Sequence, residues 1–213
     1  MFIMKPDVWI DVFEERAALM ELLDTLTPEQ WDIRSLCTEW RVRDVVGHMV
    51  SETHMTVARL ALGMIVSGLR ANRYIAKDAK RRGDAPVMEI LRDYRDMLTS
   101  RSHLPGLSSL SMLEDIVVHQ LDIRRPLDRK RSVPEQRMIA VASDLRASRF
   151  FPGVKLFQDL RVTATDAEWS AGDGPEVAGH IEALVLTLSG RFVALDELHG
   201  DGVPTVRKRA AQY

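Results

Sequence analysis

Three polar side chains in the segment 115–122 have the types and the spacing that suit metal binding. Asp115, His119 and Asp122 stand at positions i, i+4 and i+7, so on a helix they share one stripe. The residues 116–118 between them are apolar and would fill the adjoining core-facing surface. A carboxylate and an imidazole one helical turn apart can chelate one cation without distorting the backbone, as in metal sites built inside helical bundles.

A third ligand has to come from another helix, and His48 is the strongest candidate. It follows Val45-Val46-Gly47, so an imidazole stands where core packing would favour an aliphatic side chain. Gly47 would let a neighbouring helix or a ligand approach closely. We therefore expect His48, Asp115 and His119 to converge on one divalent metal.

Simpler interpretations stay open for each of these residues. A single core-facing histidine is more often a hydrogen-bonded packing residue than a ligand. Two histidines and an acid on apolar helix faces are harder to explain in this way, because each would carry a desolvation penalty if left unpaired. Asp122 is either a ligand or an acceptor that orients an imidazole. Glu52 stands one turn after His48 and is a possible ligand, but a solvated acid is the favoured interpretation.

The elements that must position these residues are mainly helices. Apolar periodicity, proline and capping residues predict helices over 7–25, 42–68, 87–102, 110–124 and 134–149. The pattern changes after residues 151–153: an alternating β-branched strand is predicted over 160–165, a short strand and turn over 169–174, and an apolar helix within 175–195. We expect an α+β, mainly α, fold, with a bundle of four or five helices over 1–149 and a small α/β domain over 150–213.

Composition narrows the class of protein. The 213 residues carry a formal charge of −2, so charge gives no case for a nucleic acid or an anionic membrane as partner. The basic runs 80–82 and 124–131 read as solvated loop or helix-end charge. Cys37 is the one cysteine, which excludes an internal disulfide and fits the reducing cytoplasm. With no signal-peptide pattern and no apolar run long enough for a bilayer, we expect a soluble cytoplasmic protein, monomer or homodimer.

The segments 26–31, 35–48 and 115–127 resemble the mycothiol-dependent maleylpyruvate isomerase family, which belongs to the DinB-like metal-binding helical bundles. The segments 162–177 and 188–191 are similar to the small C-terminal α/β domain of that family. The resemblance covers nearly the whole chain and implies a DinB-like four-helix bundle followed by that domain.

The resemblance also implies a ligand set and an ion. In the family, a histidine of the second helix joins an acid-x-x-x-histidine pair to hold a divalent metal, usually zinc, which carries over to His48, Asp115 and His119. Two positions depart from the pattern. Asp115 stands where the isomerases often have glutamate, and Arg41 stands where the family has a serine or threonine cap, which leaves Asp44 to satisfy the first amides of the helix.

Three protein ligands leave an open position on zinc, which is typical of catalytic sites and favours the thiolate of a bound thiol. The resemblance implies that the thiol is mycothiol, the small thiol of actinobacteria, used for isomerisation of an unsaturated acid or for S-transfer to an electrophile. Arg191 would contact a substrate carboxylate, or it is simply a charge at a helix C-terminus. The alternatives are a non-catalytic metal- or ligand-binding module of the stress-related type and a bundle that has lost its metal.

Overall fold

The computed structural model describes residues 7–37, 39–66, 68, 70–103, 106–148 and 151–213, and it divides into two compact units. Helix α1 (Val8–Leu23) opens the first unit. Its N-terminus is capped by Asp7, whose carboxylate accepts a hydrogen bond of 3.1 Å from the backbone N–H of Trp9. Val12, Leu19 and Leu23 are buried along one side of α1, as the amphipathic pattern predicts.

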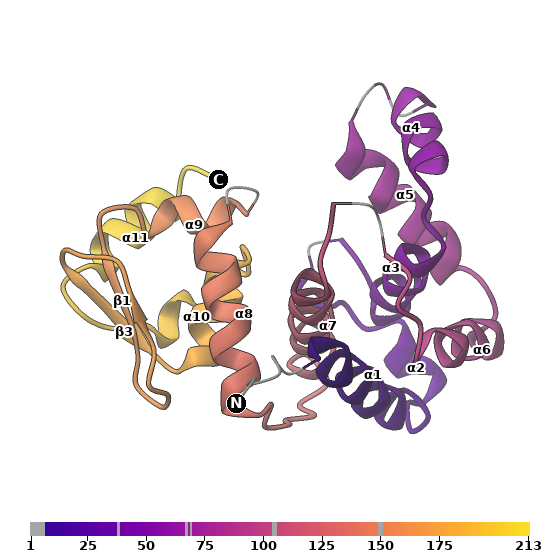
Figure 1. Ribbon diagram of the computed structural model, residues 1–213, viewed down its shortest axis with the longest axis horizontal. Coiled ribbons are helices and arrows are strands. Elements are labelled where there is room, and N and C mark those ends of the chain that lie inside the picture. The colour runs from indigo at the N-terminus through magenta and orange to yellow at the C-terminus, as the bar shows by residue number, and fades with distance from the viewer. Residues whose placement is uncertain (1–6, 38, 67, 69, 104–105, 149–150) are drawn as a thin grey trace, which may run out of the picture. The chain divides into compact units, whose positions relative to one another are not determined.

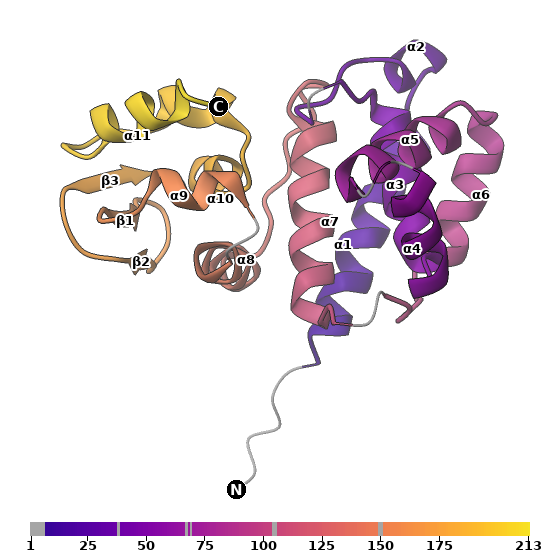
Figure 2. The ribbon, with the colours of Figure 1, turned by 90° about the horizontal axis from the view of Figure 1, so that it is seen from above.

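Four helices form the bundle of the first unit: α1, α3 (Val42–His54), α6 (Val87–Met97) and α7 (Ser109–Arg124). Helices α1 and α7 lie side by side (Figures 1 and 2). They run in the same direction, because Gln120 bonds to Glu15 and Arg124 bonds to the carbonyl of Ala18 further along α1. Helix α3 packs against both α6 and α7, which brings the expected metal ligands onto facing helices.

The helix predicted over 42–68 is wrong as a single element. Helix α3 ends where Met55 adopts an extended backbone with ψ of 124°, and α4 (Val57–Val66) begins directly afterwards. The Thr56 hydroxyl accepts a hydrogen bond from the backbone N–H of Arg59, so Thr56 caps the new helix. Helix α5 (Ala71–Gly83), which the sequence did not predict, then packs against both α3 and α4.

The shorter elements of the first unit hold the ends of the bundle. Helix α2 (Pro28–Trp31) is a single turn with proline at its first position, and its Trp31 is buried. The segment 32–41 then leads to α3 and is tied to the bundle by a hydrogen bond of 3.1 Å from the backbone N–H of Leu36 to the carbonyl of Asp122. This connection brings Trp40 next to the C-terminal half of α7.

The second unit is a small sheet covered by helices. Strands β1 (Arg161–Ala164), β2 (Ser170–Ala171) and β3 (Glu176–Gly179) are arranged in the order β2-β1-β3, with β1 antiparallel to β2 and parallel to β3. The buried apolar helix α10 (Ile181–Leu188) packs on β1 and β3. The remaining elements are α9 (Pro152–Leu156), the 3₁₀-helix η1 (Phe192–Glu197) and α11 (Val203–Ala210).

The division between the units falls between Lys130 and Arg131, whereas the sequence pattern placed the boundary at 149/150. Helix α8 (Glu135–Ala147) packs against α10 through the buried residues Val141, Ala142 and Leu145, so it clusters with the second unit. Residues 149 and 150 themselves lie outside the described residues. The mainly helical α+β fold that the sequence predicts is confirmed. Within the described residues, no helix combines the length and the apolar character that crossing a membrane requires.

Candidate metal centre

Helix α7 presents the predicted stripe of Asp115, His119 and Asp122. Ser108 caps this helix by accepting a hydrogen bond of 3.1 Å from the backbone N–H of Ser111. Asp122 is fully buried and His119 is 6% exposed, while the Asp115 side chain keeps 20% of its surface accessible. The stripe therefore runs from the buried centre of the bundle toward solvent, and Asp115 stands at its accessible end.

The start of α3 fixes the position of His48. The buried Asp44 carboxylate accepts a hydrogen bond of 2.9 Å from the backbone N–H of Arg41, as expected for an acid that closes the first turn. The side chain of Arg41 cannot cap the helix. Its guanidinium instead donates two hydrogen bonds to the same carboxylate, from Nε at 3.0 Å and from Nη2 at 2.9 Å. Both carboxylate oxygens of Asp44 are thus used to anchor the helix one turn before His48.

Gly47 allows the close approach that the sequence predicted. A Cβ atom built on Gly47 would lie 3.0 Å from the carbonyl oxygen of Ala79, from Cβ of Arg82 and from the backbone nitrogen of Gly83. The neighbour is therefore the backbone of α5, which packs directly on α3. His48, the next residue, turns toward α7 on the other side of the helix.

His48, Asp115 and His119 come together as predicted. One ligand atom from each residue can be chosen so that all three lie within 4.8 Å of one another. Nε2 of His119 lies 3.2 Å from Oδ1 of Asp115, and Nε2 of His48 lies 3.9 Å from the same oxygen. The two imidazole rings meet edge to face, with centroids 5.1 Å apart. Two imidazoles and one carboxylate are a donor set that suits zinc and several other divalent ions.

Asp122 orients one of these imidazoles. Its Oδ2 lies 2.8 Å from Nδ1 of His119, in a fully buried hydrogen bond. A carboxylate on one ring nitrogen holds the ring and directs the other nitrogen, here Nε2, toward Asp115. Of the two interpretations that the sequence left open for Asp122, the structure supports the orienting acceptor.

The charges at the site hold Asp115 and His119 as an ion pair. Burial alone would lower the pKa of His119, but the Asp115 carboxylate, together with the hydrogen bond to Asp122, raises it well above its ordinary value. Burial would raise the pKa of Asp115, but the positive charges of His119 and His48 outweigh it and lower that pKa to about 2. The carboxylates of the site therefore favour positive charge on the neighbouring imidazole.

Glu52 belongs to the site, although the sequence favoured a solvated acid. Its Oε1 lies 3.6 Å from Nε2 of His48, and its side chain is only 22% exposed. Burial and the negative charge of Asp115 raise the pKa of Glu52 well above the ordinary value. The i, i+4 spacing to His48 was the available signal, but only the packing of α3 on α7 shows that this face is largely shielded from water.

Trp40 is a wall of the site that the sequence did not single out. It is 8% exposed, and its ring centroid lies 5.0 Å from that of His48 and 6.3 Å from that of His119. Its indole shields both imidazoles from solvent and limits the orientations of their rings. An aromatic residue shortly before the helix of His48 was the only signal in the sequence.

Arg191 lies in the second unit, directly after α10. Its Nη1 donates a hydrogen bond of 2.8 Å to the carbonyl oxygen of Ser189, the C-terminal cap of that helix. This bond fits the alternative interpretation, a cation that stabilises a helix C-terminus. A role for Arg191 in substrate binding stays a prediction.

Comparison with known proteins agrees with this architecture. Residues 12–105 match the family model of the mycothiol maleylpyruvate isomerase N-terminal domain. Two crystal structures, of the mycothiol-dependent maleylpyruvate isomerase and of a histidine-to-alanine mutant of it, are similar to the chain with TM-scores of 0.56 and 0.57. Each is 13% identical and the similarity covers 91% of both chains. No curated protein matches the chain.

The resemblance to this family is therefore confirmed, by sequence over residues 12–105 and by fold over most of the chain. His48 lies inside the matched segment, whereas Asp115 and His119 lie beyond it. At 13% identity the similarity to the crystal structures shows the fold alone, so the functional residues of the present chain have to be argued from their own geometry.

Proposed function

We propose that His48, Asp115 and His119 bind one divalent metal ion, with zinc as the expected ion. The observation that carries this proposal is the meeting of two imidazole nitrogens and one carboxylate oxygen within 4.8 Å. The donor types fit the ion, and the buried hydrogen bond from Asp122 to His119 is the support that metal-ligating histidines usually have.

A zinc ion with three protein ligands supplies an open position that lowers the pKa of a bound thiol and favours its thiolate. The chain's own residues prepare the place for that thiol. Asp115 carries the accessible edge of the site, Trp40 shields the histidines, and Glu52 lies beside His48.

We further propose that the thiol is mycothiol and that the protein is an enzyme, either an isomerase of an unsaturated acid or an S-transferase acting on an electrophile. Support comes from the matched N-terminal domain and from the fold shared with the mycothiol-dependent maleylpyruvate isomerase. A non-catalytic metal- or ligand-binding module is the alternative. Asp115 supports this alternative, because its carboxylate is one methylene shorter than the glutamate that the isomerases often have at this position.

In the enzyme, Arg191 would bind a carboxylate of the substrate. A planar guanidinium presents paired N–H donors whose geometry matches a carboxylate. Substitution with lysine keeps the charge but removes the paired donors. An Arg191→Lys enzyme with raised KM and unchanged kcat would support this role, whereas unchanged values of both would leave Arg191 as a helix-terminal charge.

Metal content tests the first proposal directly. Elemental analysis by mass spectrometry is expected to find one equivalent of metal in protein purified without a histidine tag. The His48→Ala variant is expected to lose this metal. The matched control is His180→Ala, because the imidazole of His180 is 76% exposed and lies beside Asp166 in the second unit. If His48→Ala keeps the metal content of the unmodified protein, the ligand set is wrong.

Activity tests the second proposal. The zinc-loaded protein is incubated with mycothiol and either maleylpyruvate or a panel of electrophiles, and isomerisation and thiol consumption are followed. Glutathione and bacillithiol serve as control thiols. Metal-dependent turnover with mycothiol supports the enzyme, and the same turnover with the control thiols would show that the thiol is misassigned. One equivalent of metal with no turnover in any arm would favour the binding module.

A further inference from the structure

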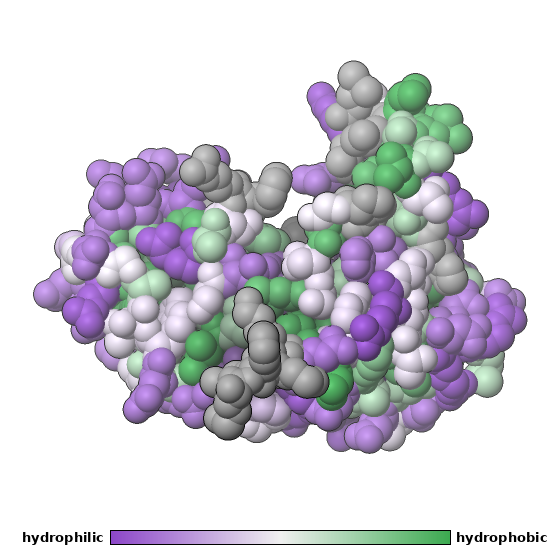
Figure 3. All heavy atoms as spheres, in the orientation of Figure 1, coloured by the Kyte–Doolittle hydropathy of each residue, from purple (hydrophilic) through white to green (hydrophobic). Residues whose placement is uncertain are grey.

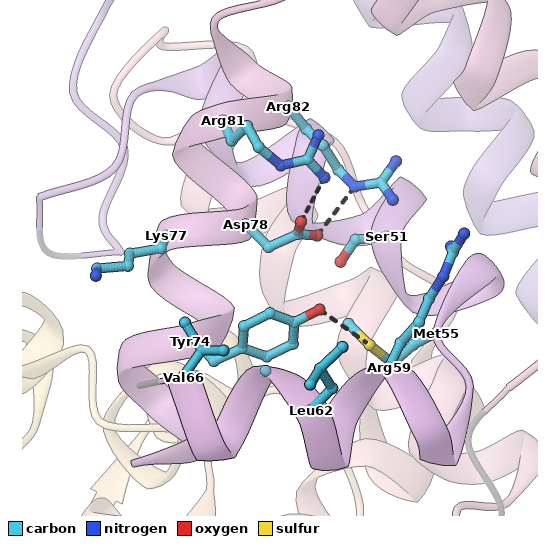
Figure 4. Close-up of a pocket in the computed structure, with 11 residues that line it drawn as sticks. Ser51, Met55, Arg59, Leu62, Val66, Tyr74, Lys77, Asp78, Arg81 and Arg82 are labelled. Atoms are coloured by element: carbon cyan, nitrogen blue, oxygen red, sulfur yellow. Dashed lines mark hydrogen bonds and ion pairs between the residues drawn. The ribbon is translucent and has the colours of Figure 1, made fainter. Parts of the chain in front are cut away.

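A cavity with a volume of about 640 Å³ lies between α3, α4 and α5 (Figure 4). None of the three proposed metal ligands lines it. This volume falls in the range of sites that hold small organic molecules. Because the cavity and the metal centre are lined by different residues of α3, their ligands can be tested separately.

One wall of the cavity is apolar and open to solvent. Leu62 and Val66 of α4 are 64% and 77% exposed, and hydrophobic residues gather on the surface over this helix (Figure 3). The ring of Tyr74 faces them from α5 (Figure 4). Gly63 lets α4 come close, because a Cβ atom on Gly63 would collide with the Tyr74 ring. This wall offers an apolar surface to a ligand that enters from solvent.

The cations of the lining come from both helices, Arg59 from α4 and the others from α5. The charged residues that line the cavity are the cations Arg59, Lys77, Arg81 and Arg82 and the single acid Asp78. Asp78 is 8% exposed and uses both oxygens internally, at 2.6 Å from Nη2 of Arg81 and 3.0 Å from Nε of Arg82. Four positive charges against one negative charge leave an excess of three, so the cavity favours an anion.

Ser51 adds a hydroxyl to the lining of the cavity. Ser51 is only 3% exposed as a residue. The hydroxyl points into the cavity, between the cationic group and Tyr74 (Figure 4). A hydroxyl in this position can donate a hydrogen bond to an anion that enters the cavity.

We propose that this cavity binds an organic anion with an apolar body, of the class of medium-chain carboxylates. The head group would lie near Arg59, Arg82 and the Ser51 hydroxyl, and the chain would lie along Leu62, Val66 and the Tyr74 ring. Inorganic anions would use only the cations of the lining, and neutral amphiphiles would use only the apolar wall. The site goes beyond the proposed thiol chemistry and does not depend on it.

Calorimetric titration with octanoate tests the site, with octanol and inorganic phosphate as the two half-ligands. A ligand of this size is expected to bind with a dissociation constant of about 0.1–1 mM. Octanol and phosphate are each expected to bind at least about tenfold more weakly, because each lacks one of the two contacts. If octanol or phosphate binds as tightly as octanoate, the proposal is contradicted. It is also contradicted if no octanoate binding is detected up to about 10 mM, well above the expected range of dissociation constants.

Matched variants locate the binding. Arg59→Gln is expected to weaken octanoate binding about three- to tenfold and Ser51→Ala about threefold. The control Arg73→Gln removes an exposed cation of α5 that does not line the cavity, and it is expected to change nothing. His48→Ala should also bind octanoate normally. Equal losses in Arg59→Gln and Arg73→Gln, or loss of binding in His48→Ala, would overturn the assignment of the ligand to this cavity.

Discussion

Helix α7 carries two buried polar clusters that differ in how their hydrogen-bonding groups are matched. In the structural cluster, formed by Glu15, Gln120 and Arg124, donors and acceptors alternate. The Gln120 amide donates to Oε2 of Glu15 at 2.7 Å and accepts from Nε of Arg124 at 3.0 Å. Arg124 donates in turn to the carbonyl of Ala18 at 2.7 Å. Donors supplied by the chain itself satisfy this cluster.

The metal cluster, formed by His48, Glu52, Asp115, His119 and Asp122, gathers three carboxyl groups around two imidazoles. The buried Arg16 carries a positive charge that interacts electrostatically with Asp115 and Glu52. Its described hydrogen bonds, however, go to the carbonyls of Met97 and Ser100, at 2.9 and 2.7 Å. One cluster is thus matched by its own donors, while the other concentrates acceptors at one point and suits an added cation.

The largest expected effect comes from breaking the structural cluster. Glu15→Leu removes the carboxylate acceptor of the buried Gln120 amide and leaves only its 3.2 Å bond to the backbone carbonyl of residue 15, so the free energy of unfolding is expected to fall by about 3 kcal/mol. Denaturant unfolding measures this loss, and Glu21→Leu on the exposed side of α1 is the control. The metal content should stay at one equivalent. Loss of metal together with stability would show that the two clusters are not separate.

In the metal cluster, Asp122→Asn is expected to lower zinc affinity about 10–100-fold, because His119 loses the carboxylate that orients it and raises its basicity. Competition with a zinc chelator measures the affinity. The unfolding free energy of the metal-free protein gives the comparison, since asparagine fills the same space. An affinity equal to that of the unmodified protein would mean that Asp122 has only a packing role.

The pH dependence of stability tests the charge state of the metal-free cluster. The pKa of His119 in the folded protein is raised above the unfolded value of about 6.5, so its contribution is fully present below that pH and is lost as the pH rises through the folded pKa. The loss amounts to about 1.4 kcal/mol per unit of pKa difference. Unfolding with a chelator present should show this decline above about pH 6.5, and His119→Gln should remove it. A decline that persists in His119→Gln would assign it to other groups.

The smallest expected effect comes from Glu52 and tests whether this residue only lies beside His48 or is itself a metal ligand. Burial and the charge of Asp115 favour the neutral form of Glu52, for which glutamine is a close substitute. Glu52→Gln is therefore expected to change zinc affinity by less than about threefold. Chelator competition, run alongside Asp122→Asn, provides the measurement. A decrease of more than about tenfold would make Glu52 a fourth ligand.

The sequence predicted the helices whose ends carry strong local signals. Ser108 caps α7, Pro126 follows its end, and Pro134 precedes α8, so these helices were placed within one or two residues. Helix α5 was missed because most of its residues are charged or polar, and the pattern of apolar residues was the main guide. Strand β3 was absorbed into the predicted helix, because four residues between Pro175 and His180 are too few for a periodic signal.

By itself, the sequence determined the parts of the metal site that depend on local geometry. Asp115, His119 and Asp122 share a stripe because a helix turns once every 3.6 residues, and the bond from Asp122 to His119 follows from that spacing. Only the tertiary structure decided that His48 meets this stripe, that Glu52 and Trp40 enclose it, and that Arg59, Ser51 and Tyr74 border one cavity. Those relations join distant segments, and their distances are set by how the helices pack rather than by any local pattern.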